Sequence, residues 1–167
     1  MSIPTHISAS RALAREEQYV GRIDSVRLDR LADFSPQDIE AELFFRFDAA
    51  RFKRVEGRVK GQLSLECQVC LQSYDWQLDA PISLVIVESE DEEARVLADS
   101  DPVMVEDDRL MMHQMVEDEV LLALPLLRRC PTCDNTRRQN AAEDVDAVSD
   151  ETHRPLAALK NLSLKGK

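Results

Sequence analysis

The chain has 167 residues, 44% of them apolar, which is enough for one domain with a hydrophobic core. No apolar stretch is long enough to cross a bilayer as a helix, and the first residues lack the features of a signal peptide, so we expect a cytoplasmic protein. The formal net charge of −11 argues against a general nucleic-acid-binding protein, because Lys and Arg supply the attraction to phosphate.

The charges are distributed unevenly along the chain. Residues 88–109 contain ten acidic and two basic residues, whereas residues 51–60 contain five basic residues and one acidic residue. Most of the basic residues alternate with apolar ones, which usually indicates the solvated face of a strand. They are also a possible contact surface for RNA or for an acidic partner. These residues are Arg51, Lys53, Arg54, Arg58 and Lys60.

The first third of the chain predicts short elements followed by a strand. Residues 1–18 are polar, and we expect a loose arm or a short helix there. Residues 19–26 predict a first strand, and residues 28–34 predict a connecting turn of helix. Residues 41–47 alternate between apolar and polar side chains, the pattern of a half-buried strand.

The clearest strand pattern covers residues 54–67, where apolar and polar side chains alternate almost without exception. A second alternating run covers residues 74–80. Pro81 interrupts it, and a more apolar strand continues over residues 82–87. Together these runs predict an antiparallel hairpin whose tip carries the Cys67–Cys70 pair.

The periodicity then changes from that of strands to that of a helix. The acid-rich residues 88–101 have no periodic apolar face and predict an exposed loop, and residues 101–106 predict a short return strand. In residues 109–124 the apolar side chains recur three and four positions apart, as on an amphipathic helix. Asp107 and Asp108 are placed to cap its start, and the proline that follows ends it.

The domain organisation follows from these patterns. We expect one β-rich domain over residues 1–134 that includes the helix at 109–124. Residues 135–152 are polar and acidic and predict a flexible linker. In residues 153–167 three leucines recur at helical spacing, which predicts a short C-terminal helix that docks onto its own domain or onto a partner.

All four cysteines fall into two Cys-x-x-Cys pairs, which are Cys67 with Cys70 and Cys130 with Cys133. Zinc prefers four thiolates in a tetrahedron, and a two-residue spacer lets one tight corner present two sulfurs to the same ion. The 59 residues between the pairs exceed the usual spacing, but loop entropy grows only slowly with length. We therefore predict one structural zinc site, while reduced thiols packed near the core and a thiol redox pair remain alternatives.

The fold class predicted is α+β, with an antiparallel β meander or small barrel, one packed amphipathic helix and a four-cysteine zinc-type clamp. Other candidate sites are weaker. The three histidines have no Ser or Cys partner at a recognisable spacing, so we expect surface or packing roles for them. We interpret Glu117–Glu119 as a solvated helix surface, because three consecutive side chains cannot share one helix face.

Three segments carry a resemblance to a known family: residues 61–74, which include the first cysteine pair, residues 116–125, and residues 154–160. This combination resembles the YceD family, the large-ribosomal-subunit rRNA accumulation proteins, which are often described as metal-binding. The resemblance implies a non-enzymatic factor that promotes the synthesis, processing or accumulation of large-subunit (23S) rRNA. It also implies a role in ribosome biogenesis, with no membrane and no small-molecule substrate.

The partner that we expect is large-subunit rRNA or a pre-ribosomal particle, reached through ribosomal or assembly proteins because the chain is acidic. Two other functions remain open at this point. One is a thiol redox or metal-dependent enzyme, which is disfavoured because four cysteine ligands leave no open position on zinc. The other is an acidic protein-interaction adaptor unrelated to ribosomes.

Overall fold

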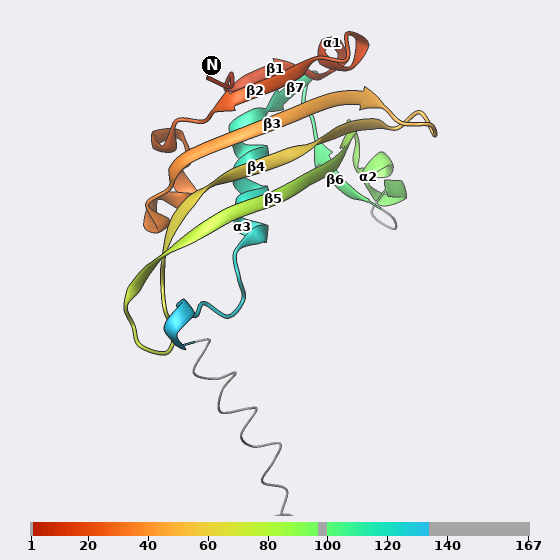
Figure 1. Cartoon of the computed structure of the whole chain (residues 1–167). Coiled ribbons are helices and arrows are strands. Elements are labelled where there is room, and N and C mark those ends of the chain that lie inside the picture. Colours follow the sequence, from red (N-terminus) through yellow and green to blue (C-terminus); the bar gives the residue numbers. More distant parts are fainter. Residues whose placement is uncertain (1, 97–99, 134–167) are drawn as a thin grey trace, which may run out of the picture. The chain divides into compact units, whose positions relative to one another are not determined.

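The protein is described by a computed structural model that covers residues 2–96 and 100–133 (Figure 1). Its centre is a five-stranded sheet with the strand order β2-β3-β4-β5-β6. The strands are β2 (Gln18–Arg22), β3 (Gln37–Phe47), β4 (Lys53–Glu66), β5 (Ser73–Val87) and β6 (Asp101–Met104). The first four form an antiparallel meander, and β6 joins parallel to β5. The predicted α+β fold and meander are confirmed, and the sheet of the described residues does not close into a barrel.

The remaining elements are shorter. Strands β1 (His6–Ser8) and β7 (Arg109–Met111) form a two-stranded antiparallel sheet. The helices are α1 (Ala9–Ala14), the 3-10 turns η1 (Ser25–Arg27) and η2 (Asp29–Phe34), α2 (Glu90–Val96) and α3 (Met112–Ala123). In Figure 1, α3 crosses behind the long strands β3, β4 and β5, and thus covers one face of the sheet. All these elements belong to residues 1–129.

Residues 130–167 form a separate unit, of which the structure describes only residues 130–133. The linker expected at 135–152 and the helix expected at 153–167 lie outside the described residues. The domain organisation therefore stays a prediction.

The core lies between the sheet and α3. Val55, Val59 and Leu63 lie on one face of β4 and have no exposed surface. Arg58 and Lys60 lie on the opposite face and are exposed. The buried face of α3 consists of Met112, Met115, Val116 and Val120. Burying each such side chain contributes roughly 1.5–3 kcal/mol, so the apolar periodicities fix which faces meet.

The two glycines of β4 allow the neighbouring strand β3 to approach closely. A Cβ atom on Gly57 would lie 1.9 Å from the carbonyl oxygen of Glu42, which is backbone and cannot move aside alone. A Cβ atom on Gly61 would first meet the Ile39 side chain, 2.4 Å from its Cδ1. Glycine at these two positions therefore permits the close approach of the two backbones, and the requirement is strictest at Gly57.

The N-terminal residues pack into the core. Of the two alternatives predicted for residues 1–18, the short helix is confirmed by α1, and the loose arm was wrong. Ile3, Ile7 and Leu13 are at most 5% exposed, and α1 packs beside β3. Strand β1 is held in place by pairing with β7, about a hundred positions later in the sequence. The apolar residues are too few and too irregularly spaced to show a period, which is why the sequence pattern missed them.

Two predictions between residues 74 and 106 also need correction. The strand is not interrupted at Pro81, because β6 begins to pair only at Leu84, and at Pro81 strand β5 has a neighbour on one side alone. The acid-rich segment is not a plain loop, since residues 90–96 form α2 and bury Val96. Acidic side chains in the first turn favour this helix through its dipole.

The helix predicted over residues 109–124 begins later, at Met112, because residues 109–111 form β7. Asp108 does not cap α3, whose N-cap residue makes no side-chain hydrogen bond. It serves α1 instead, where its carboxylate accepts hydrogen bonds from the Ser8 hydroxyl (2.6 Å) and from the backbone N–H of Ser10 (2.7 Å). These bonds lower the pKa of Asp108 and tie the N-terminal segment to the β7 strand.

We expect Gly57→Ala to lower the free energy of unfolding by about 3 kcal/mol and Gly61→Ala by about 1 kcal/mol. The difference arises because the Ile39 side chain can change rotamer, whereas the Glu42 carbonyl can move only with its strand. Urea denaturation of both variants and the wild type measures these values. Equal losses would contradict the backbone clash.

We expect Asp108→Asn to destabilise the protein at pH 7 and to weaken the loss of stability on acidification. The pKa of Asp108 is lower in the folded chain, so its stabilisation is present above the unfolded pKa and is lost as the pH falls below about 4 toward the folded pKa. Melting temperatures measured between pH 6 and pH 3 test this. A variant whose melting temperature falls as steeply as that of the wild type would contradict it.

Candidate metal centre

The first cysteine pair lies in the tight corner that joins β4 to β5. The backbone N–H of Leu71 donates to the Cys67 carbonyl (2.8 Å), and the N–H of Cys67 donates to the Gln72 carbonyl (2.9 Å). Leu71 has a φ of 58°, in the left-handed region, so the chain reverses directly after Cys70. The predicted placement of this pair at a hairpin tip is confirmed.

The chain that leads from α3 toward the second pair is anchored to this corner by its backbone. Helix α3 ends at Ala123, and Leu124 is extended before Pro125, as the proline ring requires. The carbonyl of Arg128 accepts a hydrogen bond from the N–H of Gln68 (2.9 Å), which lies between the first two cysteines. The Arg128 guanidinium also stacks on Phe34, 5.0 Å from the ring centroid.

Both contacts come from residues that are not cysteines. The hydrogen bond holds the chain two residues before Cys130 against the Cys67–Cys70 corner, and the ring contact holds it against the end of η2. Residues 131–133 then have helical backbone, and Pro131 occupies the first helical position, where its missing N–H and fixed φ are favourable.

The four cysteines are brought together as one group. Their sulfurs all lie within 4.8 Å of one another, and among the residues that the structure describes no other group of three or more His, Cys, Asp or Glu side chains could hold a metal ion in this way. In a zinc tetrathiolate the sulfurs lie about 2.3 Å from the ion, and the edge of the tetrahedron is about 3.8 Å. Four sulfurs at this spacing can therefore bind one metal ion after small adjustments.

Burial differs among the four side chains. Cys67 has no exposed surface, Cys130 and Cys133 are half-buried, and Cys70 is exposed. Four soft thiolate donors favour zinc or another thiophilic metal over magnesium or calcium, which prefer oxygen ligands. The donor set therefore fits a metal centre.

The basic residues predicted as a contact surface are divided between two faces of the sheet. Side chains alternate between the two faces of β4, and Lys53 falls on the same face as the core residues. Arg51 precedes the strand, and its guanidinium lies 5.1 Å from the Phe47 ring centroid. The outer face of β4 presents Arg54, Arg58 and Lys60.

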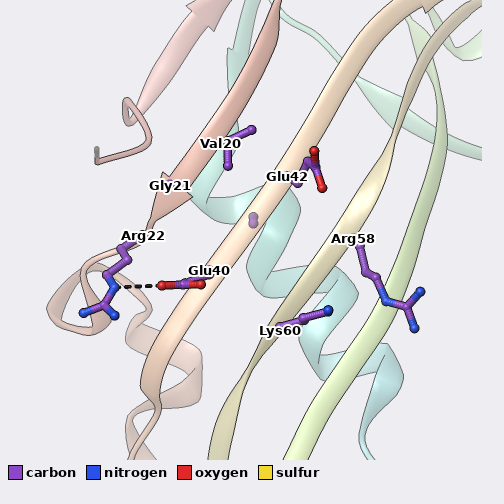
Figure 2. Close-up of a pocket in the computed structure, with 8 residues that line it drawn as sticks. Val20, Gly21, Arg22, Glu40, Glu42, Arg58 and Lys60 are labelled. Carbon is purple, nitrogen blue, oxygen red and sulfur yellow. Dashed lines mark hydrogen bonds and ion pairs between the residues drawn. The ribbon is translucent and has the colours of Figure 1, made fainter.

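Three of these basic residues have carboxylate partners. The pairs are Arg54 with Asp48, Arg58 with Asp79 and Lys53 with Glu88. The hydrogen bond from the Arg58 guanidinium lowers the pKa of Asp79. Figure 2 shows a similar pair on the neighbouring strands, where Arg22 binds Glu40 near Arg58 and Lys60. Positive and negative side chains therefore alternate on this face. Contact with RNA through it stays a prediction.

The interpretation of Glu117–Glu119 as a solvated surface was wrong for Glu117, which is 5% exposed. Its carboxylate accepts hydrogen bonds from the backbone N–H of Arg30 (2.7 Å) and from the Arg30 Nε (2.9 Å). The pair joins α3 to η2, and both oxygens of the buried carboxylate accept hydrogen bonds from Arg30. Its position three residues before Val120, on the apolar side of the helical period, was the signal available in the sequence.

In the part of the chain that the structure describes, no helix is both long and apolar enough to span a bilayer.

The family model for the large ribosomal RNA subunit accumulation protein YceD matches residues 55–163, a range that contains all four cysteines. The chain belongs to the YceD family. It is also 24% identical, over 171 aligned residues, to a large ribosomal RNA subunit accumulation protein YceD of Haemophilus influenzae. That alignment covers 99% of this chain and 98% of the relative. No solved structure matches the chain.

Proposed function

We propose that this protein is a non-enzymatic ribosome-biogenesis factor that promotes the accumulation of large-subunit (23S) rRNA in the cytoplasm. The observation that carries the proposal is the family match over residues 55–163, together with similarity over nearly the whole length of a YceD relative. The family description names an effect on rRNA and does not name a reaction. A factor that acts by binding fits this description.

We also propose that the four clustered cysteines hold one structural zinc ion. Zinc bound there would cross-link the β4–β5 corner to the chain that follows α3, at the place where Gln68 and Arg128 already share a hydrogen bond. Four protein thiolates fill the coordination sphere of zinc and leave no position for an activated water. This favours a structural role over the alternative of a metal-dependent enzyme.

The acidic character of the chain favours proteins over bare RNA as the direct partner. The net charge is −11, and three of the five basic residues near the start of β4 are engaged by carboxylates. Phosphate binding depends on unpaired Lys and Arg, because it is driven by counterion release. The protein therefore acts on pre-ribosomal particles through ribosomal or assembly proteins.

We expect purified wild-type protein to contain about one zinc per chain, and Cys67→Ser to contain little. Loss of the ion should lower the free energy of unfolding by about 4 kcal/mol or more, since it removes a cross-link between distant segments. Elemental analysis and thermal melting measure both effects, with Ser73→Ala at the start of β5 as the control.

Because a failure of Cys67→Ser to fold would hide the effect on metal content, the wild type treated with a strong chelator provides the second measurement. Wild type without zinc whose four thiols are alkylated rapidly would contradict the metal site. Chelation that leaves melting unchanged but removes a catalytic activity would favour the enzyme alternative.

We expect cells that lack the protein to have a lower ratio of large-subunit to small-subunit rRNA. Expression of the wild type should restore the ratio, and expression of Cys67→Ser should not, because the proposed zinc site maintains the fold. Quantified total RNA from the three strains, with immunoblots of the protein, tests this. An unchanged ratio in the deletion strain would contradict the proposed function and favour the unrelated acidic adaptor.

A further inference from the structure

An open groove runs between strand β6 and helix α3. It consists of two adjoining cavities with volumes of 760 and 400 Å³. Both are lined by Pro102 and Val103 from β6 and by Met115 and Asp118 from α3. Because they share these four residues, the two cavities form one continuous surface, defined here as the β6–α3 groove.

The lining of the β6–α3 groove beneath its rim is apolar. Met115 and Leu84 belong to the core and line it from below, and Val103 is half-buried. At the rim, Met104 is 44% exposed and Leu122 is 79% exposed. An apolar lining with exposed aliphatic side chains at its edges is typical of a surface that binds another chain.

The rim of the groove is strongly acidic. Five carboxylates line it, against one guanidinium, that of Arg109. The acidic residues are Asp101, Glu106, Asp107, Asp118 and Glu119. Asp118 is ion-paired with Arg30, so this rim carries an excess of negative charge even after that pair is counted.

Among the rim carboxylates, Glu119 lies in an environment that disfavours its charge. Partial burial raises the pKa of Glu119, and the nearby charges of Asp101 and Asp118 raise it further. A cationic side chain placed between the carboxylates would relieve this repulsion. The rim therefore complements a positively charged partner, while the floor complements aliphatic side chains.

We propose that the β6–α3 groove binds a basic, leucine-bearing segment of an rRNA-binding protein. Proteins that bind rRNA carry Lys and Arg in order to neutralise phosphates, and a groove with carboxylates above an apolar floor matches such a segment in both charge and hydrophobicity. This inference rests on the proposed function and deepens it, because it names the surface and the chemistry of the partner.

The test measures fluorescence anisotropy of a synthetic amphipathic peptide, composed of leucine and lysine with leucines three and four positions apart, on the full-length protein. We expect the double variant Asp101→Asn/Glu119→Gln to bind it about five- to tenfold more weakly and with less dependence on salt. The control Glu90→Gln/Asp91→Asn removes the same charge from α2, outside the groove, and should change the affinity less than twofold.

Leu122→Ala tests how much apolar contacts contribute to peptide binding, and Val26→Ala is its control. Both side chains are highly exposed, at 79% and 82%, so neither change should impair folding. We expect only Leu122→Ala to weaken peptide binding. Equal effects of groove and control variants would overturn the proposal, because the peptide would then bind through net charge alone.

Two other outcomes would overturn the proposal, one by giving the groove a different occupant and the other by placing the contact with the ribosomal component on β4. If Leu156→Ser/Leu159→Ser in the full-length chain raised the peptide affinity tenfold, the groove would belong to the chain's own C-terminal segment, and the partner assignment would be wrong. Tight binding of purified 23S rRNA, lost on changing Arg54, Arg58 and Lys60 to Glu but not on changing the groove, would place the contact on β4 and overturn the proposal.

The groove variants, expressed in the deletion strain, separate this inference from the proposed function. We expect Asp101→Asn/Glu119→Gln to restore the rRNA ratio less well than the α2 control at equal protein levels. Full restoration by the groove variant would overturn the groove and leave the rRNA function standing. A deletion strain with a normal ratio would overturn the rRNA function, while groove-dependent peptide binding would still stand.

Discussion

The β4–β5 hairpin is the constraint on which the rest of the structure depends. Its two strands pair along thirteen positions, from Arg54 with Val85 to Glu66 with Ser73. The inner faces of both strands carry the core against which α3 packs, and the outer neighbours β3 and β6 align on them. The same strands extend to the corner that holds Cys67 and Cys70, so the register of one ladder sets both the core and the position of two thiols.

The corner at the hairpin tip is organised by backbone contacts that do not depend on a bound ion. The left-handed residue Leu71 and the hydrogen bond between Gln68 and Arg128 fix the tip and the incoming chain by contacts that use no thiol. Such preorganisation lowers the entropy that a metal must overcome to join segments separated by 59 residues. It also explains how a spacing much longer than that of compact zinc ribbons is compatible with one site.

The sequence was informative wherever a long period was present and uninformative where single long-range contacts decided the structure. The alternation over residues 54–67 and the helical spacing after Met112 predicted the hairpin and α3, and the cysteine spacing predicted which thiols cluster. The role of Asp108 was missed because its partners, Ser8 and Ser10, are about a hundred residues away in sequence. A local capping rule assigned Asp108 to the nearer helix, although the tertiary fold brings it to α1.

Electrostatics differ between the two surfaces that could meet a ribosomal component. On the outer face of β4 the charges alternate and are mostly paired, so its field largely cancels beyond the Debye length of about 8 Å. In the β6–α3 groove the carboxylates have one sign and lie above an apolar floor. Each exposed ion pair contributes only about 0.2–1 kcal/mol, so such a groove holds a basic segment reversibly. In the proposed interaction, ribosomal RNA, with its far higher density of negative charge, would compete for that basic segment, so a weakly binding acidic groove would suit the transfer of a protein to rRNA.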